Sequence, residues 1–152
     1  NQDNEITWLD WAAADTDVLN FTRRLIALRR DTPVLRQRRF LHGDTRTDGR
    51  PDLVWRRADG RVMTGADWTD PTRRKLMAEL RMAADTPGPL DASAVLLILN
   101  AGAAVTVTVP PGRWQRSLDT ADPLASPDTV HTAKLDVAAA SLMLLTSQPE
   151  ET

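Results

Sequence analysis

Residues 15–30, DTDVLNFTRRLIALRR, have the clearest periodic pattern in the chain. At about 100° per residue, the apolar side chains of this stretch cover about half of a helical cylinder: Val18, Leu19, Phe21, Leu25, Ile26 and Leu28. A helix that lies on a single core usually shows an apolar stripe nearer ~100° wide. The pattern therefore predicts an amphipathic helix that contacts two surfaces, only one of which need belong to this chain.

The sequence also predicts where this helix begins and ends. Asp15 or Thr16 can cap its N-terminus with a side-chain oxygen. Pro33 ends it, because the residue before a proline is kept out of the α conformation. Residues 34–40 fit either a further short turn of helix or the approach to a strand.

Downstream of residue 41 the period changes from helical to alternating. Residues 94–99 (AVLLIL) form an unbroken apolar run of strand length, which predicts a central strand buried on both faces. Residues 104–109 (AVTVTV) alternate, with valines toward a core and threonines toward solvent. Further short strands are predicted at residues 52–57 and 61–63, joined by an Asp-Gly turn, and at 75–84, 114–118, 133–137 and 141–146. This spacing is typical of an antiparallel β-sandwich.

Length and composition are those of one globular domain. The chain has 152 residues, of which 41% are hydrophobic and 26% charged. No apolar run approaches the roughly 20 residues that span a membrane, and no signal-peptide pattern is present. With no cysteine in the chain, disulfides and thiol catalysis are excluded, and a cytoplasmic location is expected. The start at Asn1, without methionine, suggests a piece of a longer protein.

Arginines are concentrated between residues 21 and 62, a distribution that raises the question of nucleic-acid binding. The only lysines are Lys75 and Lys134, and no aromatic residues interleave with the cluster at Arg36, Arg38 and Arg39. We therefore interpret the basic stretch as a solvated or inter-domain salt-bridged surface, and we expect neither a nucleic-acid nor a membrane partner.

The polar residues do not form a recognisable catalytic or metal-binding constellation. Hydrolysis of a glycosidic bond needs paired carboxyl groups with separated pKa values, whereas the carboxylates in question lie in turn-rich segments where Asx turns explain them: Asp67, Asp70, Asp119 and Asp122. His42 and His131 are isolated in polar loops, without partners at ligand spacing. We expect no catalytic residue, no metal and no cofactor in this chain.

Five tryptophans are the other residues of interest. Trp8 and Trp11 lie in the segment before the helix and are expected to dock it beside the helix, with sugar stacking as the alternative. The remaining three, Trp55, Trp68 and Trp114, either fill the core or form stacking platforms for a sugar, and Trp68 is expected to be tucked beneath an irregular connection.

Three stretches resemble consecutive motifs of the bacterial isoamylase-type glycogen debranching enzymes, members of the α-amylase superfamily. They are residues 2–11 (QDNEITWLDW), 21–40 (FTRRLIALRRDTPVLRQRRF) and 52–68 (DLVWRRADGRVMTGADW). Residues 96–101 (LLILNA) and the segment 114–120 are also similar to the C-terminal part of that family.

The resemblance implies that residues 1–41 are the last loop and helix of a (β/α)₈ catalytic barrel and that residues 42–152 are a C-terminal antiparallel β-sandwich. The parent enzyme would hydrolyse α-1,6 branch linkages of glycogen or limit dextrin, with catalytic residues upstream of this chain, which would be inactive alone. The loop would lie on the active-site side of the barrel. The residues that could contact glucan there, in a distant part of the cleft, are Asp3, Asn4, Glu5 and Trp8.

Partners follow from the same resemblance: the rest of the parent enzyme, the α-glucan through that parent, and self-association through the helix when the chain is isolated. An alternative function is a glucan-binding accessory β-sandwich module. A third, an arginine-driven adaptor, would show steep salt dependence of association.

Overall fold

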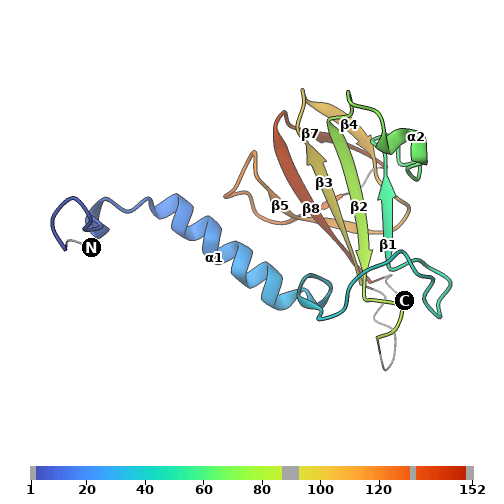
Figure 1. Ribbon diagram of the computed structural model, residues 1–152, viewed down its shortest axis with the longest axis horizontal. Helices are drawn as coiled ribbons and strands as arrows, with labels where there is room; N and C mark the ends of the chain where they lie inside the picture. Colours follow the sequence, from blue (N-terminus) through green and yellow to red (C-terminus); the bar gives the residue numbers. More distant parts are fainter. Residues whose placement is uncertain (1–2, 87–92, 131–132, 150–152) are drawn as a thin grey trace.

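Two antiparallel sheets form most of the structure, a computed structural model that describes residues 3–86, 93–130 and 133–149 (Figure 1). The larger sheet has the strand order β1-β2-β3-β8-β5-β6. Its strands are β1 (Leu53–Arg56), β2 (Lys75–Arg81), β3 (Ala94–Asn100), β5 (Trp114–Asp119), β6 (Asp128–Val130) and β8 (Ser141–Ser147). The smaller sheet pairs β4 (Val105–Thr108) with β7 (Lys134–Val137). The prediction of a mainly β, antiparallel sandwich is thus confirmed.

The strand β3 is central, as its unbroken apolar run predicts. On its inner face Leu96 and Ile98 are buried against the smaller sheet, where they meet Val107 and Val137. Alternate residues of a strand point to opposite faces, so the outer face of β3 carries Val95, which is fully buried in a second apolar cluster. Other elements therefore cover the inner face of this strand and the part of its outer face around Val95.

The outer cluster is closed by the N-terminal helical segment. The helix α1 (Thr16–Asp31) is followed by η2 (Pro33–Arg36), a single 3₁₀ turn, which decides between the two alternatives for residues 34–40. Val34 of η2 is buried, and Phe21 and Leu28 of α1 pack half-buried against the same cluster. The sandwich thus uses one side of α1 as a cover for its outer face.

The ends of α1 agree with the sequence prediction. Asp15 is the N-cap, since its Oδ1 accepts hydrogen bonds from the backbone N–H groups of Asp17 (2.9 Å) and Val18 (3.1 Å). At the other end Thr32 is extended and precedes Pro33. No residue of α1 is fully buried, and in Figure 1 its N-terminal half projects away from the sandwich.

Three details differ from the prediction. Residues 61–63 form no strand: a tight turn at Asp59 and Gly60 is present, but the return is a single bridge between Arg56 and Val62. The connection that follows contains a four-residue helix, α2 (Gly65–Trp68), and the strand β6 was not expected. Gly60 is required in the turn because its φ is +83° and an added Cβ would lie 3.1 Å from the Thr108 carbonyl oxygen.

The burial of Leu99 also differs. The run 94–99 predicts two buried faces along its whole length, yet Leu99 is 38% exposed near the end of β3. Because η2 covers the opposite end of this strand, the outer face is bare around Leu99. No helix in the three described stretches has the length and apolarity needed to cross a bilayer.

Shortening a fully buried side chain of β3 should destabilise the sandwich. We expect Leu96→Ala to lower the free energy of unfolding by about 2–5 kcal/mol, because it removes apolar contacts and leaves a cavity. Urea denaturation followed by circular dichroism measures this. The matched control is Leu124→Ala, at a side chain that is 61% exposed, for which a change within about 0.5 kcal/mol is expected. Equal effects of the two substitutions would contradict the assigned core.

Candidate functional site

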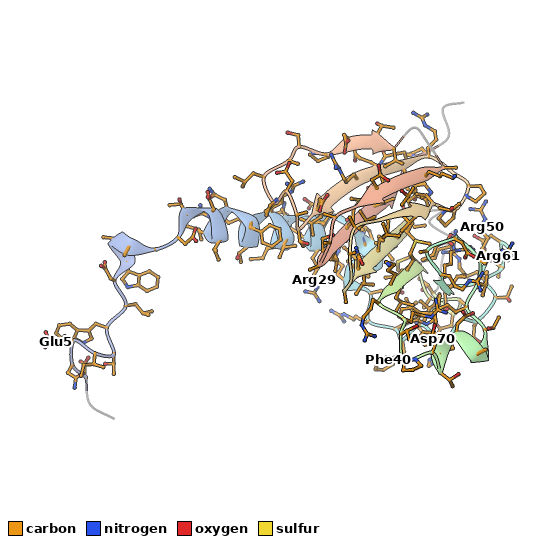
Figure 2. The ribbon with its side chains drawn as sticks, turned by 90° about the horizontal axis from the view of Figure 1, so that it is seen from above. Glu5, Arg29, Phe40, Arg50, Arg61 and Asp70 are labelled. Atoms are coloured by element: carbon orange, nitrogen blue, oxygen red, sulfur yellow. The ribbon has the colours of Figure 1, made fainter. Side chains whose placement is uncertain are left out.

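The residues predicted to contact glucan lie together in one exposed turn at the start of the described chain. The indole Nε1 of Trp8 donates to Asp3 Oδ1 at 2.5 Å. Asn4 shapes the turn, since its Oδ1 accepts from Ile6 N–H (3.1 Å) and its carbonyl oxygen accepts from Thr7 N–H (2.9 Å). Figure 2 shows Glu5 at the far end of this segment, well away from the sandwich. Gln2, the first residue of the motif, lies outside the described residues.

The prediction that the two N-terminal tryptophans dock beside the helix is wrong for this chain. Trp8 is 65% exposed and Trp11, in the short 3₁₀ helix η1 (Trp11–Ala13), is 79% exposed. Their neighbours Ile6 and Leu9 are exposed as well. An indole buries a large apolar area when it packs, so this segment presents apolar surface that no part of the described chain covers.

The other three tryptophans have different environments. Trp114 is a core residue, buried between the sheets, with its Nε1 donating to the Pro110 carbonyl oxygen at 2.9 Å. Trp55 is half-buried on β1. Trp68 is 54% exposed, which corrects the expectation that it is tucked beneath the connection. Trp55 and Trp68 meet edge to face, with ring centroids 5.5 Å apart and an interplanar angle of 83°.

Trp68 belongs to an apolar surface at the end of the sheet. Met63 and Trp68 border two neighbouring shallow grooves, one reaching Leu76 and Leu99 and the other reaching Leu53 and Trp55. We call this region the Trp68 surface and define it by the apolar side chains that line it: Leu53, Trp55, Val62, Met63, Trp68, Leu76 and Leu99. Charged residues at its rim include Asp67, Asp70, Arg73, Arg74 and Lys75. The sequence gives these residues no common pattern, because β1, α2, β2 and β3 meet only in the fold.

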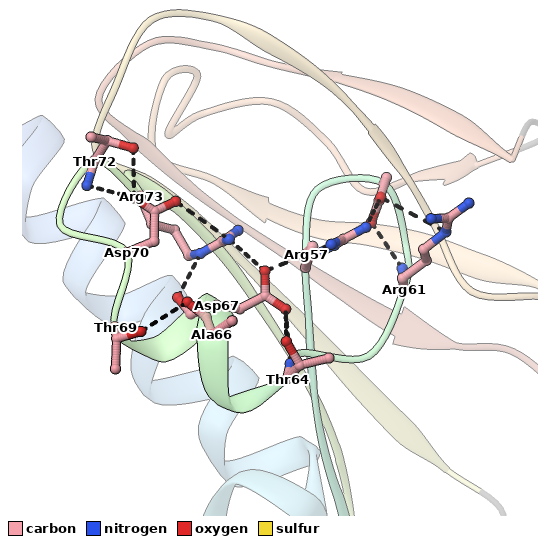
Figure 3. A network of polar contacts seen from close by, with 10 residues as sticks. Arg57, Arg61, Thr64, Ala66, Asp67, Thr69, Asp70, Thr72 and Arg73 are labelled. Atoms are coloured by element: carbon pink, nitrogen blue, oxygen red, sulfur yellow. Dashed lines mark hydrogen bonds and ion pairs between the residues drawn. The ribbon is translucent and has the colours of Figure 1, made fainter.

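A polar network fixes the backbone beneath Trp68 (Figure 3). Asp67 Oδ2 accepts from both the N–H and the hydroxyl of Thr64, at 2.8 Å each, in a capping box. Arg73 donates to Asp67 twice, to the carboxylate at 2.6 Å and to the backbone carbonyl at 2.9 Å. Arg57 lies 3.6 Å from the same carboxylate. The residue that precedes Trp68 is therefore held from three directions.

The carboxylates of this network are tuned toward the charged form. The hydrogen bonds from the Thr64 backbone and hydroxyl lower the pKa of Asp67 below its usual value, and the charges of Arg73 and Arg57 lower it further. The hydroxyl and backbone N–H of Thr72 likewise lower the pKa of Asp70. A general acid at neutral pH needs a raised pKa instead, so neither carboxylate is suited to that role.

The remaining titratable candidates also have local structural roles. Asp119 Oδ1 accepts from Ala121 N–H at 2.9 Å, an Asx turn of the kind the sequence suggests. His42 lies beside Phe40, with ring centroids 6.5 Å apart. Within the described residues no three His, Cys, Asp or Glu side chains are grouped so that they could hold a metal ion. His131 lies outside these residues.

Several arginines form ion pairs within the described chain, whereas the inter-domain salt bridges expected of the basic stretch stay a prediction. Glu79 is 3% exposed and receives Arg56 (2.7 Å between Nη2 and Oε2) and Arg81, so that a buried Arg–Glu–Arg group joins β1 to β2. On the surface Arg116 binds Asp128 at 2.7 Å. Sequence reasoning missed the buried group, because β1 and β2 pair across an intervening loop and helix.

The structure thus defines a β-sandwich domain with one long helix at its N-terminal side. No protein-family model matches the chain. The glycogen operon protein GlgX homolog of Mycobacterium tuberculosis (strain ATCC 25618 / H37Rv) is 33% identical over an alignment of 160 residues that covers 95% of this chain and 22% of that protein. The glycogen debranching enzyme of Erwinia tasmaniensis is 32% identical over 114 residues, 74% of this chain and 15% of that protein.

A third relative, the glycogen debranching enzyme of Dickeya chrysanthemi, is 33% identical over 115 residues, 75% of this chain and 15% of its own length. The chain therefore belongs to the family of GlgX-type glycogen debranching enzymes. It spans about a fifth or less of the length of these relatives.

The Asp67 network gives a pH-dependent prediction. Because the folded pKa of Asp67 is lowered, its stabilising contribution is complete above the unfolded pKa of about 4 and is lost as the pH falls through the lower folded value. Asp67→Asn should therefore lower the urea midpoint at pH 7, and the difference from the unmodified chain should shrink below about pH 4.

The control for this measurement is Asp85→Asn, which breaks the exposed ion pair with Arg39 and should change the midpoint little at any pH. An Asp67→Asn difference that stays constant from pH 7 to pH 3 would show that the charge of Asp67 does not contribute through this network.

Proposed function

We propose that the chain is the C-terminal part of a glycogen debranching enzyme of the isoamylase type, whose whole chain hydrolyses α-1,6 branch linkages of glycogen or limit dextrin. In this proposal residues 1–41 are the last loop and helix of the catalytic barrel, and residues 42–152 are a non-catalytic sandwich domain that packs on it. The similarity to parts of enzymes named for glycogen debranching supports it.

The observation that carries the proposal is the second apolar side of α1. While Phe21 and Leu28 contact the sandwich, the other apolar side chains of the helix are exposed: Val18 (60%), Leu19 (43%), Leu25 (38%) and Ile26 (62%). Burying such a side chain stabilises a protein by ~1.5–3 kcal/mol. A barrel that covers this side would turn α1 into a helix shared between two cores, as its wide apolar arc requires.

The N-terminal segment extends the same uncovered surface. Ile6, Leu9 and Trp11 are exposed next to the start of α1, and contact with the barrel would bury them. The turn that holds Asp3, Asn4, Glu5 and Trp8 would then stand near the glucan cleft, with polar groups and an exposed indole available to a sugar. We propose these four residues as substrate contacts of the assembled enzyme.

The chain itself would supply no catalytic group. Asp67 and Asp70 have lowered pKa values that do not suit a general acid, and catalysis would depend on carboxylates elsewhere in the parent enzyme. We place the enzyme in the cytoplasm, a proposal that the lack of cysteine supports. Its partners would be the barrel and the α-glucan. The exposed Trp68 favours a second role in glucan binding.

The uncovered side of α1 should make the isolated chain self-associate. Size-exclusion chromatography with light scattering should show dimers or larger species at micromolar concentration, because association would bury the exposed apolar side chains of α1. Ile26→Ser and Leu25→Ser, which remove side chains from that patch, should shift the chain toward monomer. Asn20→Ser, at an exposed polar position of α1, is the control. A monomer in every case would contradict the proposed docking surface.

The isolated chain should release no linear maltooligosaccharides from limit dextrin. Incubation followed by a reducing-end assay tests this, with a complete debranching enzyme as the positive control. Hydrolysis that persists after purification, and that Asp67→Asn or Asp70→Asn abolishes, would overturn the assignment of a non-catalytic domain.

A further inference from the structure

The Trp68 surface is the strongest unassigned feature of the sandwich. A large aromatic side chain that remains 54% exposed on a rigid support commonly marks a binding site. We propose that the Trp68 surface binds an α-glucan chain, with a glucose ring stacked on the Trp68 indole, at a site separate from the catalytic cleft. The choice of α-glucan as ligand rests on the proposed function.

The support of Trp68 is rigid. Its indole stands edge to face on Trp55, and Asp67, one residue before it, is fixed by Thr64 and Arg73. A side chain held in advance loses little conformational entropy when a ligand binds. The hydrogen bonds of Asp67 therefore hold the backbone next to Trp68, and the contact with Trp55 orients the indole.

The grooves beside Trp68 suit an extended chain ligand rather than a compact one. They are shallow, with volumes of about 320 Å³ and about 430 Å³, and Met63 and Trp68 line both. One floor is formed by Leu76 and Leu99, the other by Leu53 and Trp55. A glucan could lie across the shared wall with neighbouring rings in the two grooves, since sugar rings present an apolar face to such surfaces while their hydroxyl groups point outward.

The charges at the rim favour a neutral, hydroxyl-rich ligand. Arg73 is already paired with Asp67 (2.6 Å) and Asp70 (3.6 Å), and Arg74 donates to the carbonyl oxygens of Pro71 and Arg73. An anionic ligand would have to break these contacts to reach either guanidinium, although Lys75 also lines this groove. Hydroxyl groups can instead accept from or donate to groups of both signs without displacing them.

The position of the surface keeps it apart from the proposed contact with the barrel. Arg24 of α1 donates to the carbonyl oxygens of Ser117 and Pro123, near β5, whereas Trp68 follows β1, at the opposite edge of the larger sheet. Figure 1 shows α2 and the projecting end of α1 on opposite sides of the sandwich. The contact of α1 with the sandwich and the Trp68 surface therefore lie toward opposite edges of the larger sheet.

Affinity electrophoresis of the 152-residue chain in native gels that contain glycogen tests the site. The unmodified chain should be retarded, and Trp68→Ala should weaken the apparent affinity about tenfold or more, as removal of a central tryptophan does at other binding sites. Trp68→Phe should bind with intermediate affinity. Leu124→Ala, which removes an equally exposed apolar side chain elsewhere, should leave the retardation unchanged, and Trp8→Ala separates this site from the N-terminal turn.

A titration with maltoheptaose followed by NMR gives a second readout that does not depend on a variant. Among the five indole N–H signals, those of Trp55 and Trp68 should shift. Retardation that survives Trp68→Ala, or no retardation of the unmodified chain and no indole shift, would overturn the proposal.

The outcome is distinguishable from a failure of the proposed function. If the chain self-associates through α1 and lacks hydrolytic activity, yet does not bind glycogen, the proposed non-catalytic domain is supported and the glucan site at Trp68 is contradicted. If glycogen is bound at Trp68 while Ile26→Ser changes nothing in the oligomeric state, the site stands and the docking surface falls.

Discussion

The burial of β3 on both faces is the constraint on which the rest of the structure depends. A strand that carries Val95 on one face and Leu96 and Ile98 on the other needs an apolar layer on each side. The pair β4-β7 supplies the inner layer, and α1 with η2 supplies part of the outer one. The sandwich thus requires the helix as a cover. Because a helix is a cylinder, only one of its sides can contact the sheet.

A buried ion group fixes the register of β1 and β2 at the edge of the larger sheet. Glu79 lies on the inner face between Arg56 and Arg81, where removing one partner would leave a charge without compensation in a region of low dielectric. A shift of the β1–β2 register by one residue would move Glu79 to the other face. The ion group therefore adds specificity at the β1 edge of the sheet, and this same edge carries Trp68.

Periodicity predicts the long helix and the long strand of this chain because each contains several repeats of its apolar pattern. Residues 15–30 and 94–99 each contain enough repeats to reveal their period, but β6 has three residues and α2 four, too few for any period to emerge. Whether a tryptophan is buried or exposed is harder still to predict. Trp114 is buried and Trp68 exposed because of strands that are distant in sequence, and the expected docking of Trp8 and Trp11 failed because nothing in the described chain lies beside them.

The two uncovered apolar regions of the molecule differ in a way that assigns them to different ligands. The bare side of α1 is dominated by aliphatic side chains such as Leu25 and Ile26, and such a surface is stabilised by shape and by exclusion of water when another protein core meets it. The Trp68 surface combines an indole with rim groups that are already paired, Asp67 and Arg73. That mixture suits a hydrated, neutral polymer, whose hydroxyl groups would lose hydrogen bonds against a purely aliphatic face. The sandwich can therefore serve a protein core at one edge and a glucan at the other without competition between them.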